Sequence, residues 1–74
     1  MASIDVVAEV TGTVFKITAE AGQRLNEDDE IILIESMKME IPVAMPEKGA
    51  VVEIVVAESD MVAEGQVLAR IDTA

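Results

Sequence analysis

An internal repeat is the feature of this sequence that most restricts its possible folds. Sliding the chain along itself by 37 residues, half of its 74, brings similar residues together without a gap. The identical pairs are Ile4 and Ile41, Val6 and Val43, Gly12 and Gly49, Val14 and Val51, Ile17 and Ile54, Glu27 and Glu64, and Ile34 and Ile71. Neither half is large enough to bury a core by itself. We therefore predict a single domain over residues 1–74, with an approximate two-fold axis that exchanges its halves.

The joint between the halves falls between Met37 and Lys38. An axis that exchanges the halves must also exchange this joint with the two chain ends. We therefore expect Lys38 and the chain ends to occupy equivalent but separate places. A lysine in that place would be displayed away from anything attached to either end.

Apolar residues alternate with other residues near the joint. The run Ile31-Ile32-Leu33-Ile34 is followed by apolar residues at every second position, namely Met37, Met39, Ile41, Val43 and Met45. This period of two indicates a strand with one buried face, which leaves Lys38 on the opposite face. Residues 30–45 are too many for one strand, since strands usually have roughly three to ten residues. We therefore expect the chain to reverse at residues 36–38, although no glycine-containing hairpin pair lies there.

The remaining sequence predicts further short strands separated by turns. Strands are expected over residues 4–8, 13–18, 24–25, 30–35, 39–44, 51–56, 61–62 and 67–72, with a loop over 46–49 and no helical pattern. Phe15 is the only aromatic residue, so the core should consist of small aliphatic side chains between two sheets. The predicted fold class is all-β: a flattened barrel or sandwich of two four-stranded antiparallel sheets with quasi-two-fold symmetry.

The repeat also pairs residues of the turns. Gly22 in the first half corresponds to Ser59, and Gly65 in the second half corresponds to Asp28. Glycine and small polar residues both tolerate the unusual φ that some turns need. We therefore interpret all four as turn-forming residues with no further role.

Composition excludes several classes of function. The chain has no cysteine and no histidine, which removes disulfides, thiol nucleophiles, most zinc sites and imidazole acid–base chemistry. Its 15 acidic and 5 basic residues give a net charge of −10, which argues against nucleic acid and anionic membranes as partners. No segment resembles a signal peptide or a membrane span. We expect a cytoplasmic protein that binds neither nucleic acid nor membranes and holds no metal.

The residues around the joint resemble a known motif. Glu35-Ser36-Met37-Lys38-Met39 is similar to Glu-Ala-Met-Lys-Met, the biotin-attachment motif of the biotinyl/lipoyl carrier domains. The similarity covers essentially the whole chain, including residues 43–49 and residues 61–68, the latter resembling the family's Val-x-x-Gly-Gln-x-Leu. This resemblance implies the biotinyl/lipoyl-like barrel as the fold.

Some residues depart from the family's pattern. Ser36 stands where alanine is most common, Asp28 replaces a frequent glycine, and Glu9-Val10 replace Pro-Met before the first glycine. The insertion that protrudes beside biotin in some bacterial acetyl-CoA carboxylase carriers is absent, because Thr18 leads to Arg24 by a tight turn. We expect these departures to leave the attachment hairpin unchanged.

The resemblance implies that Lys38 is the attachment site, where the ε-amine would form an amide with the side-chain carboxyl of biotin. Glu35, Ser36, Met37 and Met39 would then be contacts for a biotin protein ligase. In the family, biotin carries carboxylate from a biotin carboxylase, which uses ATP and bicarbonate, to a carboxyltransferase. The chain would accordingly be a biotin carboxyl carrier and not itself an enzyme.

Two other functions stay open at this stage. The lipoyl branch of the family typically has Asp-Lys-Ala at this place, so the methionines favour biotin, and a lipoate carrier modified at Lys38 is the first alternative. An unmodified acidic β-domain used only for protein interaction is the second. Met37 and Met39 share the parity of Ile41, so they are either core residues or half-exposed contacts for partners. Glu35 and Glu40 are interpreted as surface charges, because nothing desolvates an exposed hairpin.

Overall fold

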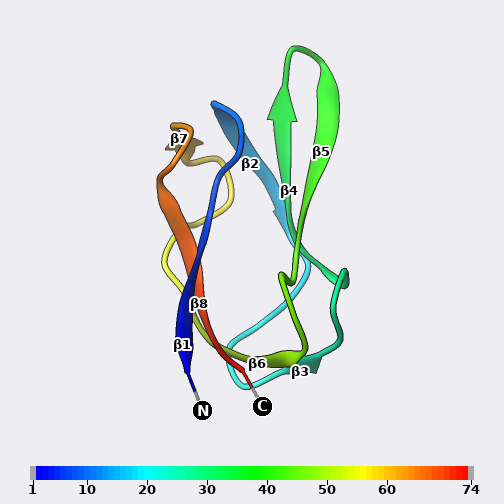
Figure 1. Ribbon diagram of the computed structural model, residues 1–74. Coiled ribbons are helices and arrows are strands. Elements are labelled where there is room, and N and C mark those ends of the chain that lie inside the picture. Colours follow the sequence, from blue (N-terminus) through cyan, green and yellow to red (C-terminus); the bar gives the residue numbers. More distant parts are fainter. Residues whose placement is uncertain (1, 74) are drawn as a thin grey trace.

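The computed structural model describes residues 2–73 and shows two four-stranded antiparallel sheets (Figure 1). The first sheet has the strand order β1 (Ser3–Val7), β8 (Val67–Thr73), β6 (Gly49–Ile54), β3 (Arg24–Leu25). The second has the order β5 (Met39–Ala44), β4 (Glu30–Ser36), β2 (Gly12–Ile17), β7 (Met61–Val62). Over residues 2–73, no helix is long and apolar enough to cross a membrane. The predicted all-β fold is confirmed.

The two sheets are equivalent under the 37-residue repeat. When residue numbers are shifted by 37, β1 corresponds to β5, β8 to β4, β6 to β2 and β3 to β7. The strand order of one sheet then becomes the strand order of the other. Hydrogen bonds between loops and strands follow the same rule. Gly22 N donates to Val51 O at 2.7 Å, and the equivalent Ser59 N donates to Val14 O at 2.8 Å. The predicted quasi-two-fold symmetry is therefore present in the backbone as well as in the sequence.

The core between the sheets is aliphatic, as Phe15, the only aromatic, is half exposed at 49%. The largest fully buried side chains are Ile31, Ile32, Ile34, Met45, Leu68, Ile71, Val14 and Val51. These buried side chains come from both halves of the repeat, which explains why neither half would fold alone.

The register of the sheets shifts at equivalent places. Ile31 is the extra residue where β4 pairs with β5, and Leu68 is the extra residue where β8 pairs with β1. Each bulge turns two successive side chains toward the core, so Ile31 and Ile32 are both fully buried, as are Leu68 and Ala69. The unbroken apolar run at the start of β4 is thus explained by a bulge.

Five of the eight predicted strands differ from the structure by one or two residues at their ends. The strands predicted over residues 4–8, 13–18 and 51–56 are β1, β2 and β6, and each begins and ends earlier, while β4 and β8 each end one residue later than predicted. The starts of β2 and β6 were missed for one reason: Gly12 and Gly49 were left outside the predicted strands, but they are the first residues of β2 and β6. A Cβ at Gly12 would lie 2.4 Å from Glu35 O, and one at Gly49 would lie 2.2 Å from Asp72 O. These glycines permit a close approach of two strands and do not end them.

The four turn residues paired by the repeat share one backbone conformation. Gly22 and Gly65 have φ of 92° and 87°, while Ser59 and Asp28 have φ of 79° and 73°. The interpretation of these residues as formers of turns with positive φ is confirmed.

The molecule is elongated, with principal extents of 35 × 17 × 17 Å. The described ends of the chain lie together at one end of it, where Thr73 N donates to Ala2 O at 2.8 Å. The β4–β5 hairpin forms the opposite end (Figure 1). Met1 and Ala74, which the repeat pairs with Lys38 and Met37, lie outside the described residues.

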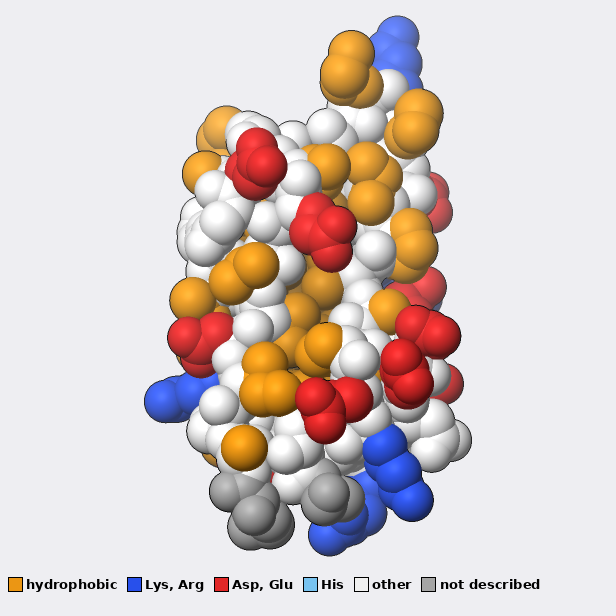
Figure 2. Space-filling view, viewed as in Figure 1, with side chains coloured by type: hydrophobic (Ala, Val, Ile, Leu, Met, Phe, Trp, Pro, Cys, Tyr) orange, Lys and Arg blue, Asp and Glu red, His pale blue; other side chains and the backbone are white. Residues whose placement is uncertain are grey.

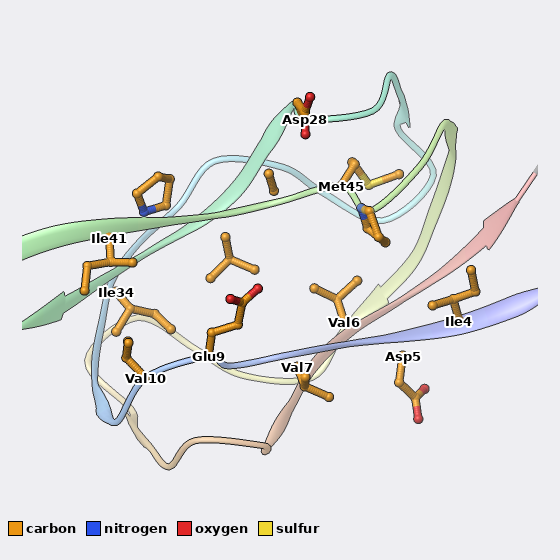
Figure 3. A pocket seen from close by; sticks show the side chains of 14 residues that line it. Ile4, Asp5, Val6, Val7, Glu9, Val10, Asp28, Ile34, Ile41 and Met45 are labelled. Atoms are coloured by element: carbon orange, nitrogen blue, oxygen red, sulfur yellow. The ribbon is translucent and has the colours of Figure 1, made fainter.

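An open groove of about 410 Å³ separates the edge strands β1 and β5 (Figures 2 and 3). Val6 and Ile34 point into it, whereas Asp5 points away (Figure 3). Its lining includes the equivalent residues Ile4 and Ile41, so the groove lies along the approximate two-fold axis.

Candidate functional site

The β4–β5 hairpin ends in a two-residue turn made of Met37 and Lys38. Ser36 pairs with Met39 as the last rung of the ladder, so only these two residues join the strands. Both have positive φ, 53° for Met37 and 64° for Lys38. Two consecutive left-handed residues give the turn whose twist matches that of a hairpin, and this turn usually requires Asn-Gly. The predicted reversal at residues 36–38 is confirmed.

Neither Met37 nor Lys38 favours this backbone conformation. Left-handed geometry costs an L-residue with a side chain roughly 1–2 kcal/mol, because Cβ comes too close to the following carbonyl oxygen. The ladder below the turn holds it in place, with Ile34 opposite Ile41 and a fully buried Ile34 side chain. The buried base of the hairpin therefore fixes the position of its exposed tip.

The side chains at the tip project into solvent, and basic and hydrophobic groups stand side by side there (Figure 2). Met37 is 91% exposed and Met39 is 62% exposed. Lys38 is exposed as well. The tip extends past the neighbouring strands, so the core does not reach it (Figure 1). Of the two interpretations of the methionines, burial in the core is excluded and a surface role is left.

The Lys38 ammonium has no hydrogen-bonding or ion-pair partner within residues 2–73, where the only ion pair joins Arg70 and Glu53. Glu35 and Glu40 flank the turn, but they face each other across the hairpin and are both exposed. Their interpretation as surface charges agrees with this exposure. The amine is therefore free to react.

Ser36 ties the base of the turn to two loops. Its Oγ donates to Thr11 O at 2.9 Å, across 25 positions of sequence. Thr11 Oγ1 in turn accepts the N–H of Glu64 at 3.2 Å. Sequence reasoning missed Thr11, because a contact between such distant residues leaves no local pattern. Ser36 therefore steadies the hairpin in addition to its predicted contact with a ligase.

The chemistry of the site is that of a single amine. Within residues 2–73, no group of three or more His, Cys, Asp or Glu side chains could hold a metal ion. A free amine on a narrow, exposed turn fits a group that is attached through a carboxyl, as biotin and lipoate are. Attachment requires an enzyme that admits the turn, and the protruding hairpin allows one to approach it from several sides.

Comparisons with known proteins identify the family of the chain. The family model described as "Biotin-requiring enzyme" matches residues 5–71, which include the whole hairpin. The chain is 38% identical over 60 residues to the biotin/lipoyl attachment protein of Bacillus subtilis, covering 81% of this chain and 82% of that protein. It is 36% identical over 67 residues to the biotinylated protein TB7.3 homolog of Mycobacterium leprae, covering 90% of this chain and 94% of that protein.

The fold also matches a solved structure. The crystal structure of the Kluyveromyces lactis urea carboxylase superimposes with a TM-score of 0.92 and 32% identity, covering 97% of this chain but only 6% of that one. A fold of this kind thus forms a small part of a carboxylase. From the family match over residues 5–71 and the two relatives of similar length, the chain belongs to the biotin/lipoyl attachment domain family, whose members of this size are carriers and not catalysts.

Proposed function

We propose that Lys38 is the residue to which biotin is attached, and that the chain is the carboxyl carrier of a biotin-dependent carboxylase. The observation that supports this most directly is the free amine on the two-residue turn, at the tip of a hairpin held by a buried base. The Met-Lys-Met sequence at the turn and the relative named as a biotinylated protein favour biotin over lipoate.

The hairpin suits a carrier because it joins a rigid support to a flexible arm. The Lys38 side chain is a four-carbon stem that rotates freely, whereas the backbone below it is fixed by the ladder. A group tethered in this way visits two active sites at a high effective concentration. Biotin, when attached, supplies a ring nitrogen that holds carboxylate. The residues of this chain present the arm, and the reactions belong to a biotin carboxylase and a carboxyltransferase.

Glu35, Ser36, Met37 and Met39 form the proposed contact surface for a biotin protein ligase. The two methionines stand on either side of Lys38 with most of their surface exposed. Methionine is flexible and polarizable, so it adapts to several partner surfaces. Such a surface suits an arm that must enter a ligase and two other enzymes in turn. Within this proposal the carrier works in the cytoplasm.

Replacement of the acceptor lysine tests the proposal. We expect the parent chain to gain the mass of one biotinyl group when it is incubated with a biotin protein ligase, biotin and ATP, and Lys38→Arg to gain none. Lys48→Arg, an exposed lysine in the loop after β5, is the matched control and should be modified like the parent. Intact mass followed by peptide mapping measures both results. Biotin on Lys38→Arg at the parent's level would disprove the assignment.

A parallel incubation with a lipoate ligase separates the alternatives. Modification by the lipoate ligase and never by the biotin ligase would establish a lipoyl carrier on the same lysine. A folded parent chain that neither ligase modifies would leave only the interaction domain.

A further inference from the structure

The outer faces of the two sheets carry different side chains although their backbones are equivalent. On the sheet β5-β4-β2-β7, side chains of β4 point alternately inward and outward, so Leu33 lies on the outer face between the buried Ile32 and Ile34. Leu33 pairs with Pro42 on one side and with Lys16, next to the bulged Phe15, on the other. Met61 of β7 lies opposite Thr13, two residues before Phe15 on β2. We call Phe15, Leu33, Pro42 and Met61 the hairpin face.

The repeat supplies an internal control for this face. The equivalent positions on the other sheet hold Val52, Arg70, Asp5 and Arg24. There, Arg70 pairs with Asp5 on one side and Glu53 on the other, and forms an ion pair with Glu53. The same backbone thus folds with charged side chains at these positions. The apolar side chains of the hairpin face are therefore not required by the fold.

The exposure of the hairpin face also indicates that its apolar side chains do not serve the fold. Phe15 is 49% exposed and Met61 is 81% exposed. Together with Met37 and Met39 at the tip, these are the large exposed Met and Phe side chains within residues 2–73, whereas the other large exposed apolar residues are all valines. Methionine and aromatic residues are enriched in protein interfaces. The apolar surface that a partner could cover is thus concentrated on the sheet that bears Lys38.

Charges beside the hairpin face indicate the chemistry of its partner. Glu35 and Glu40 lie on the same outer side near the turn, and Glu58, which accepts the N–H of Ile17 at 3.1 Å, lies at the far end of β2. These three carboxylates outnumber Lys16, the lysine on the same outer side, and biotin attached to Lys38 would remove the charge of that lysine. A complementary surface would be apolar at its centre and basic at its rim. An enzyme that binds ATP and bicarbonate has positive charge around its active site, because both substrates are anions.

We propose that the hairpin face is the surface with which the carrier docks on its biotin carboxylase while the Lys38 arm enters the active site. This inference rests on the proposed function of the chain. The apolar side chains supply contact area beside the arm, and the carboxylates orient the carrier toward the basic rim. The sheet β1-β8-β6-β3 stays in solvent during this reaction.

An exchange of side chains between the sheets tests the inference. Phe15→Val with Met61→Arg gives the hairpin face two residues of the other sheet, and Val52→Phe with Arg24→Met is the matched reverse exchange. Both proteins are biotinylated, checked by intact mass and thermal melting, and used as substrates of the biotin carboxylase from the same organism. Free biotin serves as the control substrate. The KM for the carrier is measured from bicarbonate-dependent cleavage of ATP.

We expect the first exchange to raise the KM about tenfold or more with kcat unchanged, because two anchor residues are lost. The reverse exchange should leave the KM near that of the parent, and added NaCl should raise the parent's KM.

Equal KM values for parent and first exchange would overturn the inference, and so would equal effects of the two exchanges. A parent dimer that the first exchange dissociates without a change in KM would assign the face to self-association instead. If the proposed function itself is wrong, the parent chain will carry no biotin, and this is seen by intact mass before any KM is measured.

Discussion

At the scale of single residues, the turn of the hairpin consists of two residues in a backbone conformation that neither favours. Met37 and Lys38 both adopt a left-handed conformation that asparagine and glycine adopt with less strain. Nothing in the fold demands a methionine at position 37, since its side chain is 91% exposed. Burial of the Met37 side chain therefore does not explain the strain, and we attribute it to the proposed function of the turn.

Replacing Met37 by asparagine should stabilise the protein. We expect Met37→Asn to raise the free energy of unfolding by about 0.5–1 kcal/mol, because asparagine tolerates positive φ better than methionine does. The change should also slow biotinylation, since a proposed ligase contact is lost. Met39→Asn is the control, because Met39 is in β5, where asparagine is unfavourable, and it should give no gain in stability. Urea denaturation measures both variants, and an unchanged midpoint for Met37→Asn would contradict the account of strain.

Sequence reasoning at this scale succeeded where a residue has an equivalent in the other half. Gly22 predicted a turn with an unusual φ at Ser59, and Gly65 predicted the same at Asp28; both φ are positive in the structure. It did not predict the conformation of Met37 and Lys38, because their equivalents are the chain ends and no turn-forming residue marks them. It also missed the hydrogen bond from Ser36 to Thr11, which depends on how distant loops meet.

At the scale of elements, two glycines set how closely neighbouring strands approach. Gly12 lies against the carbonyl of Glu35 in β4, and Gly49 lies against the carbonyl of Asp72 in β8. Both contacts involve backbone atoms, which cannot move aside as a side chain could. Each sheet therefore contains one position where only glycine fits, and the two positions are equivalent.

Adding a methyl group at either position should destabilise the fold. We expect Gly12→Ala and Gly49→Ala each to cost about 1–3 kcal/mol through overpacking, with a drop of about 4–8 °C in Tm per kcal/mol. Gly22→Ser is the control, because its Cβ would have no atom within 4 Å and Ser59 occupies the equivalent turn. Its cost should be smaller. Thermal melts that rank Gly22→Ser as the most damaging of the three would refute this explanation.

Strand positions were predicted well where apolar alternation is regular, and less well near these glycines. The strands β3, β5 and β7 have the predicted bounds. The starts of β2 and β6 were missed because glycine in a sequence indicates a break as often as a close contact. The bulges at Ile31 and Leu68 were not predicted, since a run of apolar residues does not reveal which of them lacks a partner.

At the scale of the whole molecule, the repeat determines where Lys38 lies relative to the chain ends. Thr73 donates to Ala2 at one end of the molecule, as Ser36 pairs with Met39 at the other. The repeat predicted this separation, because a two-fold axis fixes it without any knowledge of side-chain contacts. The groove between β1 and β5 follows from the same axis, but its depth depends on side-chain packing and could not be predicted.

A circular permutant tests this view of the molecule. We expect a chain whose original ends are joined through a short glycine linker, with new ends between Glu47 and Lys48, to fold and to accept biotin. Those two residues are exposed in a loop, and close chain ends favour permutation. The Tm should fall by no more than about 10 °C, equivalent to about 2 kcal/mol for a domain of this size. A permutant that stays unfolded, judged by circular dichroism, would mean that the ends are not equivalent to the turn.

The opposite placement of Lys38 and the chain ends also determines how the molecule responds to mechanical force. Tension between residues 2 and 73 acts at one end of β1 and β8 and peels these paired strands apart one hydrogen bond at a time. Tension between Lys38 and either end instead runs along the 35 Å axis. It pulls β4 and β5 as one unit along the axis, so β4 must slide against β2, its other neighbour in the sheet. Many hydrogen bonds then carry the load at once. The domain is accordingly stronger under tension between Lys38 and a chain end than under tension between the two ends.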